Sequence, residues 1–188
     1  MQVSGYVLAG GASSRMGQDK ALLPYGGATL VERLAGIVRQ AAGSVAIIGD
    51  PEKYGGLGYP VFGDQLPGCG PLGGLHTALT ISSADWNLVV ACDMPGISVA
   101  ILRMLLDGAS ASSKSCVVAA SLGGEMEPLC AVYHRRCLAA VFGAIQEKRF
   151  KMRDLVTELD PLIIPVDPAA LLNVNTPAEW AGLEGKPQ

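Results

Sequence analysis

Short apolar runs alternate along the chain with segments in which apolar residues recur every three to four positions. The run at 87–92, Asn-Leu-Val-Val-Ala-Cys, is apolar almost throughout, as expected for a strand covered on both faces. From Leu30 to Ala41 the apolar residues recur at helical spacing, and Gly43 follows as a stop signal. This alternation predicts a parallel α/β sheet. The expected strands are 6–8, 45–48, 61–62, 87–92, 116–120 and 129–133, and the expected helices are near 30–41, 71–82, 98–107 and 134–148.

No polar linker interrupts the alternation and no internal repeat is visible. The 188 residues therefore predict one domain, 1–188, a three-layer Rossmann-like α/β fold with a mostly parallel sheet. In such folds the ligand crevice lies beyond the carboxyl ends of the strands. The loops that follow residues 8 and 92 both fall at that edge, so we expect the functional site there.

Composition narrows the possible function classes. Hydrophobic residues make up 49% of the chain and charged residues 16%, which excludes a disordered chain. The net charge of -3 argues against a general nucleic-acid binder. No apolar run approaches the ~18 residues of a membrane span, and no basic region precedes an apolar stretch at the N-terminus. We expect a cytoplasmic protein without nucleic-acid or membrane partners.

A glycine-rich loop follows the first strand. Residues 8–20 read Leu-Ala-Gly-Gly-Ala-Ser-Ser-Arg-Met-Gly-Gln-Asp-Lys, with Arg15 and Lys20 as the cations. Backbone N–H groups in such a loop can cradle phosphate, and the two cations can neutralise it. The alternative is an ordinary surface loop with solvated cations. Lys20 precedes Ala-Leu-Leu-Pro and so borders an apolar segment, which favours the phosphate site.

An acidic residue, Asp93, follows the most apolar strand. Mg²⁺ prefers one or two carboxylates together with phosphate oxygens, so Asp93 beside a phosphate loop is a candidate Mg²⁺ ligand. The alternative is that Asp93 merely caps the helix that follows Pro95.

Spacing alone does not decide the role of two further motifs. Residues 68–73, Gly-Cys-Gly-Pro-Leu-Gly, match G-x-G-x-x-G, but they follow the third strand and not the first, so the dinucleotide fingerprint is weak. A helix beginning at Pro71 or Leu72 would still point N–H groups at an anion. Residues 173–177, Asn-Val-Asn-Thr-Pro, either line the site with two amides or turn the chain into a helix.

The five cysteines predict neither a disulfide framework nor a zinc finger, because their number is odd and no CxxC pair occurs. Cys130, His134 and Cys137 offer only three soft ligands, and Cys130 lies in an apolar strand where a thiol packs as a small hydrophobe. We interpret His76 and His134 as structural.

These motifs together resemble a known family. Residues 8–24 fit LAGGxSxRMGxDKALLP, and GPLGGL, CDMP and NVNTP follow in the order found in molybdenum cofactor guanylyltransferases, the MobA-like nucleotidyltransferases. The resemblance implies a sheet of the nucleotide-diphospho-sugar transferase type, Mg²⁺ as cofactor, and GTP and Mo-molybdopterin as substrates. It also implies transient contacts with other cofactor biosynthesis proteins and with apo-molybdoenzymes. The products would be molybdopterin guanine dinucleotide and pyrophosphate.

The resemblance also assigns residues. It places Leu8, Ala9, Gly10, Gly11, Lys20, Asp64 and Asp93 at the nucleotide, Asp93 at the metal, Arg15, Lys20 and Asp93 in catalysis, and Gly73, Gly74, Asn173 and Asn175 on the acceptor side. One position departs from the family, which often has an asparagine after the second strand where this chain has Gly49-Asp50. Gly11 gives LAGG, as in guanylyl enzymes, whereas cytidylyl relatives usually show LAAG.

The residues alone also allow four other functions. These are a molybdopterin cytidylyltransferase, a sugar-phosphate nucleotidyltransferase, a dinucleotide-dependent oxidoreductase that uses residues 68–73, and a non-catalytic nucleotide-binding module.

Overall fold

A seven-stranded sheet forms the centre of the computed structural model, which describes residues 1–10 and 19–174. Its strands are β1 (Val3–Leu8), β4 (Ala46–Ile48), β5 (Val61–Phe62), β6 (Trp86–Ala91), β7 (Cys116–Ala120), β8 (Met126–His134) and β9 (Leu162–Pro165). The strand order is β5-β4-β1-β6-β8-β7-β9. β8 is antiparallel to both its neighbours, and every other pair in this sheet is parallel. The mostly parallel sheet that the sequence predicts is confirmed.

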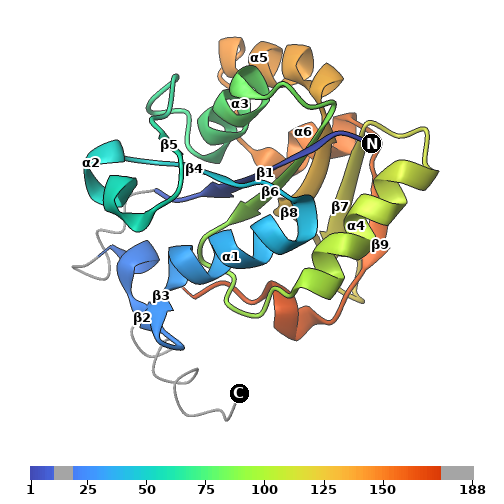
Figure 1. The fold of residues 1–188 in the computed structure, drawn as a ribbon. Helices are drawn as coiled ribbons and strands as arrows, with labels where there is room; N and C mark the ends of the chain where they lie inside the picture. Colours follow the sequence, from blue (N-terminus) through green and yellow to red (C-terminus); the bar gives the residue numbers. More distant parts are fainter. Residues whose placement is uncertain (11–18, 175–188) are drawn as a thin grey trace.

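Helices cover both faces of the sheet and complete three layers (Figure 1). α1 (Leu30–Ala42) and α4 (Val99–Ala111) pack on one face, where their apolar side chains join those of β1, β6 and β7 in one buried cluster. α3 (Pro71–Ile81), α5 (Leu138–Gln146) and α6 (Met152–Glu158) cover the opposite face around a second cluster. The alternation of strand residues between the two clusters follows from the two-residue period of a strand.

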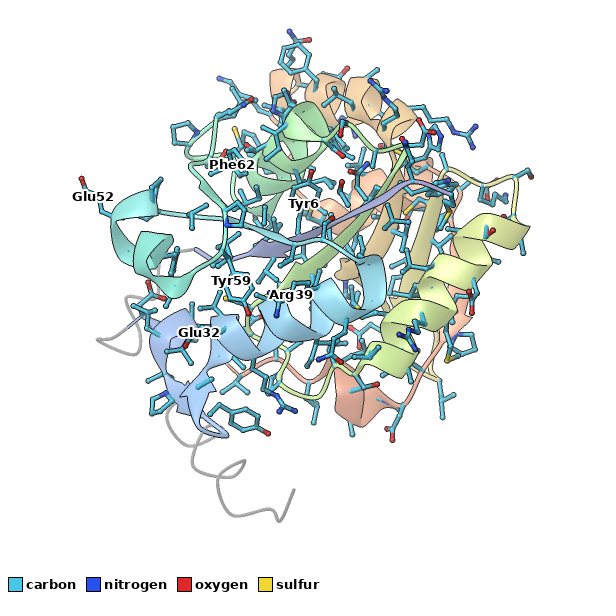
Figure 2. The ribbon with its side chains drawn as sticks, viewed as in Figure 1. Tyr6, Glu32, Arg39, Glu52, Tyr59 and Phe62 are labelled. Atoms are coloured by element: carbon cyan, nitrogen blue, oxygen red, sulfur yellow. The ribbon has the colours of Figure 1, made fainter. Side chains whose placement is uncertain are left out.

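Local signals in the sequence determine where the helices begin and end. Thr29 and Glu32 form a reciprocal capping box at the start of α1, and Gly43 ends the helix with φ 81°. Ser98 caps α4 by accepting a hydrogen bond from the Ile101 N–H. At the other end of α1, Arg39 lies 5.6 Å from the ring centre of Tyr59 and ties the helix to the segment before β5 (Figure 2).

The helix expected over 134–148 is wrong at its start. His134 is the last residue of β8, and its Nδ1 accepts a hydrogen bond from the Arg136 N–H. Residues Arg135–Cys137 then form a 3₁₀ turn (η4) before α5 begins. The strand therefore includes His134, which the sequence assigned to the helix, and α5 begins four residues later than expected.

Several short elements have no counterpart in the sequence prediction. A hairpin of β2 (Pro24–Tyr25) and β3 (Ala28–Thr29) turns at Gly26 and Gly27, which both have positive φ. The others are 3₁₀ turns and short helices, whose few residues carry too little periodicity to be read: η2 (Lys20–Leu22), α2 (Pro51–Tyr54), η3 (Gly55–Leu57) and η5 (Pro168–Leu171). In the part of the chain that the structure describes, no helix has the length and apolarity needed to cross a bilayer.

Candidate nucleotide-transfer site

A cavity of ≈ 740 Å³ lies at the carboxyl ends of β1, β4, β5 and β6. It is the crevice expected for an open α/β sheet, since the loops after these strands diverge around the ends of the central strands. In the described part of the chain its walls come from five segments: Leu8–Gly10, Ile48–Asp50, Gly63 with Asp64, the loop residues Pro67, Gly68, Gly70 and Pro71 with Gly74, and Ala91–Asp93, together with Leu129.

The end of β1 forms the floor of this cavity. The Cys92 N–H donates to the Leu8 carbonyl at 3.0 Å, and the Ala9 N–H donates to the Ile48 carbonyl at 2.8 Å, so β1 is held from both sides. Gly10 then has φ 150°, a value that glycine adopts easily. The structure thus brings Leu8, Ala9 and Gly10, three of the predicted nucleotide residues, to the cavity.

Gly49 allows the backbone after β4 to pack closely against the end of β1 and the Tyr54 ring. A Cβ at this position would meet the Ala9 carbonyl oxygen at 2.2 Å and the Tyr54 ring at 2.7 Å. Asp50, which stands where the family often has asparagine, lines the cavity and also caps α2 by accepting a hydrogen bond from the Glu52 N–H at 3.0 Å.

Asp64 is held by two hydrogen bonds at the opposite wall. Its Oδ1 accepts from the Leu66 N–H at 2.9 Å and from Thr77 Oγ1 at 3.2 Å. A Cβ on Gly73 would meet Asp64 Oδ2 at 2.7 Å. Gly73 therefore supports Asp64 from behind, whereas Gly74 itself faces the cavity.

Lys20 and Asp93 meet at one side of the cavity. Lys20 Nζ lies 4.0 Å from Asp93 Oδ2, and both side chains are largely buried, with exposed fractions of 18% and 27%. Val174 contacts both, because its carbonyl accepts from Lys20 Nζ at 3.2 Å and its N–H donates to the Asp93 carbonyl at 2.9 Å. The preceding Asp19 is fixed by the Tyr54 hydroxyl, which donates to its carboxylate at 2.8 Å.

The capping role considered for Asp93 is wrong. α4 begins at Val99 and is capped by Ser98, five residues after Asp93. Burial instead raises the pKa of the Asp93 carboxyl, and the positive charge of Lys20 acts against this shift. A partly buried carboxylate without a helix to cap is available for a cation.

The donor set at Asp93 fits Mg²⁺ bound jointly with a substrate. Within residues 1–10 and 19–174, no three His, Cys, Asp or Glu side chains gather into a metal site of their own. Mg²⁺ commonly takes one or two protein carboxylates and completes its shell with phosphate oxygens and water. Asp93 at the edge of the cavity meets that requirement.

One residue of this neighbourhood was missed by the sequence reasoning. Glu127 of β8 is half-buried, and its Oε1 accepts a hydrogen bond from the Leu129 N–H at 3.3 Å. Burial raises the pKa of the Glu127 carboxyl, and the nearby charge of Asp93 adds to this rise. Only its position two residues before the strand expected at 129–133 could have drawn attention to it.

Three predicted site residues, Gly11, Arg15 and Asn175, lie outside the described residues. The possible zinc ligands have other partners: the Cys137 thiol donates to the Ser115 carbonyl at 3.2 Å, and the His134 ring packs against Trp86 at 4.9 Å. Cys130 is buried in β8.

Comparison with known proteins identifies the family. The MobA-like NTP transferase domain matches residues 5–162. The chain belongs to this family. A molybdenum cofactor guanylyltransferase of Xanthomonas euvesicatoria pv. vesicatoria is 36% identical over 188 residues, covering 96% of this chain and 93% of that protein. A probable molybdenum cofactor guanylyltransferase of Pelotomaculum thermopropionicum is 35% identical, covering 95% and 90%.

Solved structures share the fold. Molybdopterin-guanine dinucleotide biosynthesis protein A from Archaeoglobus fulgidus superposes with a TM-score of 0.81 at 22% identity, covering 96% of each chain. 2-C-methyl-D-erythritol 4-phosphate cytidylyltransferase from Thermus thermophilus gives 0.71 at 19%, covering 98% of each. This MobA-like protein is a nucleotidyltransferase of molybdenum cofactor biosynthesis, as the resemblance implied. Membership of this family rules out the two alternatives of a dinucleotide-dependent oxidoreductase and a non-catalytic nucleotide-binding module.

Proposed function

We propose that this MobA-like protein transfers GMP from GTP to the terminal phosphate of Mo-molybdopterin, giving molybdopterin guanine dinucleotide and pyrophosphate. The observation that carries the proposal is the Lys20–Asp93 pair, 4.0 Å apart beside a cavity lined by the end of β1. It joins a phosphate-binding cation and a metal-binding carboxylate at the edge where a nucleotide fits. The curated relatives are named as guanylyltransferases, which favours GTP.

The reaction needs positioning more than covalent catalysis. An oxygen of the acceptor phosphate attacks the α-phosphorus of GTP, a new P–O bond forms, and the bond to the β-phosphate oxygen breaks. A phosphate monoester is mostly ionised near neutral pH, so its oxygen attacks without a general base. No Ser-His-Asp system is required.

The residues then have distinct tasks. The backbone of Leu8–Gly10 and the carboxylate of Asp64 hold the nucleoside part in the cavity. Lys20 and, by the family motif, Arg15 neutralise the charge that accumulates on the departing pyrophosphate. Asp93 holds Mg²⁺, which when bound draws charge from the α-phosphate. By the family motif, Gly73, Gly74, Asn173 and Asn175 contribute to the acceptor side, and Gly73 also leaves the space that Asp64 occupies.

Pyrophosphate release with each of the four nucleoside triphosphates, with and without Mo-molybdopterin and Mg²⁺, tests the proposal. We expect release only with GTP, acceptor and metal together. Faster release with CTP would assign the protein to the cytidylyltransferases, and release with a sugar phosphate in place of Mo-molybdopterin would change the acceptor. Competitive binding of GDP and CDP checks the base preference separately from turnover.

The product is handed on after transfer. We propose transient contacts with other cofactor biosynthesis proteins and with apo-molybdoenzymes. Co-purification with a molybdoenzyme in its apo form, and its loss when the cofactor is already inserted, would support this part.

A further inference from the structure

The carboxylate of Asp19, the residue before Lys20, is held by groups from two elements. Its Oδ1 accepts a hydrogen bond from the Ala21 N–H at 3.1 Å, which caps η2. Its Oδ2 accepts a hydrogen bond from the Tyr54 hydroxyl of α2 at 2.8 Å. Lys53 Nζ lies 3.6 Å from the same Oδ2, but its side chain is 55% exposed, and exposed ion pairs of this kind contribute little. Among the described residues, the Tyr54 hydroxyl is therefore the strongest tie between Asp19 and another element.

The turn that carries Lys20 depends on Asp19. η2 is a 3₁₀ turn of three residues, Lys20–Leu22, and Lys20 is its first residue. Such a short turn has few hydrogen bonds of its own: the Leu22 N–H donates to the Asp19 carbonyl at 3.0 Å, and the Leu23 N–H donates to the Lys20 carbonyl at 3.2 Å. Asp19 thus supports η2 through its carbonyl and its carboxylate. A group that holds the Asp19 carboxylate also fixes the position of the Lys20 backbone.

Tyr54 is itself fixed by its surroundings. Its side chain is buried, and its ring fills the space behind Gly49, where a Cβ would meet a ring carbon at 2.7 Å. Burial and the hydrogen bond to Asp19 raise the pKa of the Tyr54 hydroxyl well above its ordinary value, so this group remains a hydrogen-bond donor near neutral pH. Gly49 lines the cavity. One side chain thus contacts both the cavity wall and the residue that precedes the phosphate-binding lysine.

The negative charge of Asp19 lies next to a cation that has to bind phosphate. An ionised carboxylate only accepts hydrogen bonds, and one without donors would compete with phosphate for the neighbouring ammonium group. Here both Asp19 oxygens have donors, and Lys20 Nζ lies 3.2 Å from the Val174 carbonyl oxygen and 4.0 Å from Asp93 Oδ2. The Tyr54 hydroxyl therefore steadies the turn and also occupies the Asp19 oxygen that would otherwise attract Lys20.

We propose that Tyr54 is a positioning residue for Lys20, whose hydroxyl holds the Asp19 carboxylate so that the Lys20 ammonium group stays at the Asp93 edge and meets the phosphates of the nucleotide. The inference rests on the proposed function in one respect, the assignment of Lys20 to these phosphates. It extends the phosphate site from the loop after β1 to α2, since a binding residue keeps its geometry only when packing and hydrogen bonds around it hold it in place.

The test compares the binding of guanosine and of GTP. The ratio of their dissociation constants, measured by calorimetry with Mg²⁺ and without the acceptor, gives the affinity that the phosphates add. Tyr54→Phe removes only the hydroxyl and keeps the ring behind Gly49, so guanosine should bind within about two-fold of wild type. The affinity added by the phosphates should fall about five-fold or more, because a hydrogen bond to a charged group is lost, and kcat should fall with it. An unchanged phosphate contribution would overturn the proposal.

Double variants show whether the effect passes through Asp19 and Lys20. If Tyr54 acts by positioning Lys20, the addition of Tyr54→Phe to Lys20→Ala should lower the phosphate contribution by less than about two-fold. Its addition to Asp19→Ala should have an equally small effect, because the hydroxyl has then lost its partner. A fall in either double variant as large as the fall in the wild-type background would overturn the positioning role.

Tyr133→Phe is the control for loss of stability. The Tyr133 hydroxyl is also buried and donates to the Pro128 carbonyl at 2.7 Å, but Tyr133 packs in the second core cluster, on the other face of the sheet. Both variants should melt at lower temperature than wild type, and only Tyr54→Phe should lower the phosphate contribution. An equal fall in the two variants would trace the effect to stability and overturn the proposal.

Binding without turnover keeps this inference separate from the proposed function. If wild type binds GTP more tightly than guanosine but releases no pyrophosphate with Mo-molybdopterin, the proposed function fails while the binding ratio still measures Tyr54. If wild type turns over and Tyr54→Phe keeps the full phosphate contribution and kcat, the inference alone is overturned. A wild type in which the phosphates add no affinity overturns both the assignment of Lys20 and the inference.

Discussion

Lys20 Nζ lies 4.0 Å from Asp93 Oδ2, and Val174 hydrogen-bonds to both residues through its backbone. The two charges are close enough to attract each other but are not in hydrogen-bond contact. Lys20 counteracts the rise that burial causes in the pKa of Asp93. The charge of Lys20 therefore favours the ionised form of the Asp93 carboxyl, which is the form that binds a metal.

Replacement of this cation should affect turnover more than nucleoside binding. Lys20→Ala is expected to lower pyrophosphate release by about 10²–10³-fold, the usual loss for one positioned donor in a transition state, about 2.7–4 kcal/mol. Binding of guanosine, which has no phosphate, should change little. Lys114→Ala provides the control, because Lys114 is an exposed lysine paired with Asp160. Full turnover in Lys20→Ala would show that this loop does not bind the phosphates of the nucleotide.

Asp93→Asn tests the metal ligand. The variant keeps the shape of the side chain but loses the charge that binds a hard cation, so turnover should collapse and recover partly at raised Mg²⁺ or Mn²⁺. Since Ser98 caps α4, the fold has no need of an aspartate here. An active variant with ordinary metal dependence would show that Asp93 is not the ligand. Asp167→Asn is the matched comparison, because Asp167 is exposed, caps the 3₁₀ turn η5 and does not line the cavity.

The thermal stability of that variant should depend on pH. Burial raises the pKa of Asp93 in the folded state, so the folded protein binds a proton more readily than the unfolded chain. The ionised carboxyl thus costs stability above its folded pKa, and this cost disappears as the pH falls through that value. Asp93→Asn should melt at or above the wild-type temperature at pH 8, and this advantage should shrink toward pH 4. A lower Tm for Asp93→Asn than for wild type at pH 8 would contradict the expected destabilisation by the buried, ionised carboxyl.

Two adjacent glycines should respond differently to alanine. At Gly73 a Cβ would meet Asp64 Oδ2 and the Leu66 carbonyl, both at 2.7 Å, so Asp64 must move. At Gly74 the nearest atom is the end of the Leu8 side chain at 3.2 Å, which can shift. We expect Gly73→Ala to weaken GDP binding clearly more than Gly74→Ala, measured by calorimetry. Equal affinities of the two variants for GDP would indicate that Asp64 takes no part in nucleotide binding.

Thiol labelling should report on the nucleotide cavity. Cys69 is the one partly exposed cysteine of the five, and its neighbours Gly68 and Gly70 line the cavity. Burial raises the pKa of Cys92 and of Cys130 to about 12, so these thiols stay protonated and inert near neutral pH. We expect one rapidly labelled thiol in the native protein, lost in Cys69→Ser and protected by GTP with Mg²⁺. Binding of GTP without protection would place the nucleotide away from the 68–70 loop.

Much of the central fold could be predicted because its signals are local. Thr29 and Glu32 mark the start of α1, Gly43 marks its end, and the apolar run of β6 needs two covered faces. The antiparallel direction of β8 could not be predicted, since a buried strand shows the same apolar pattern in either direction. The bulge of β8 depends on the register of its pairing with β7, which the sequence of β8 alone does not indicate.

The candidate site divides in the same way. The loop residues Lys20 and Asp93 carry their own chemistry and were found from sequence, and the structure brings them together. Glu127 was missed because its surroundings come from the fold: it lies half-buried at the register shift between β7 and β8, which the residues around it in the sequence do not indicate. Asp64 was found, but its dependence on the space left by Gly73 follows only from packing.

The hydrogen bond between Lys20 and Val174 joins residues 154 positions apart. The described residues that line the cavity all lie before residue 130. The Lys20–Val174–Asp93 link therefore depends on a segment that is synthesised after this whole lining. A chain cut before Val174 would retain the lining residues but would lack the carbonyl that holds Lys20.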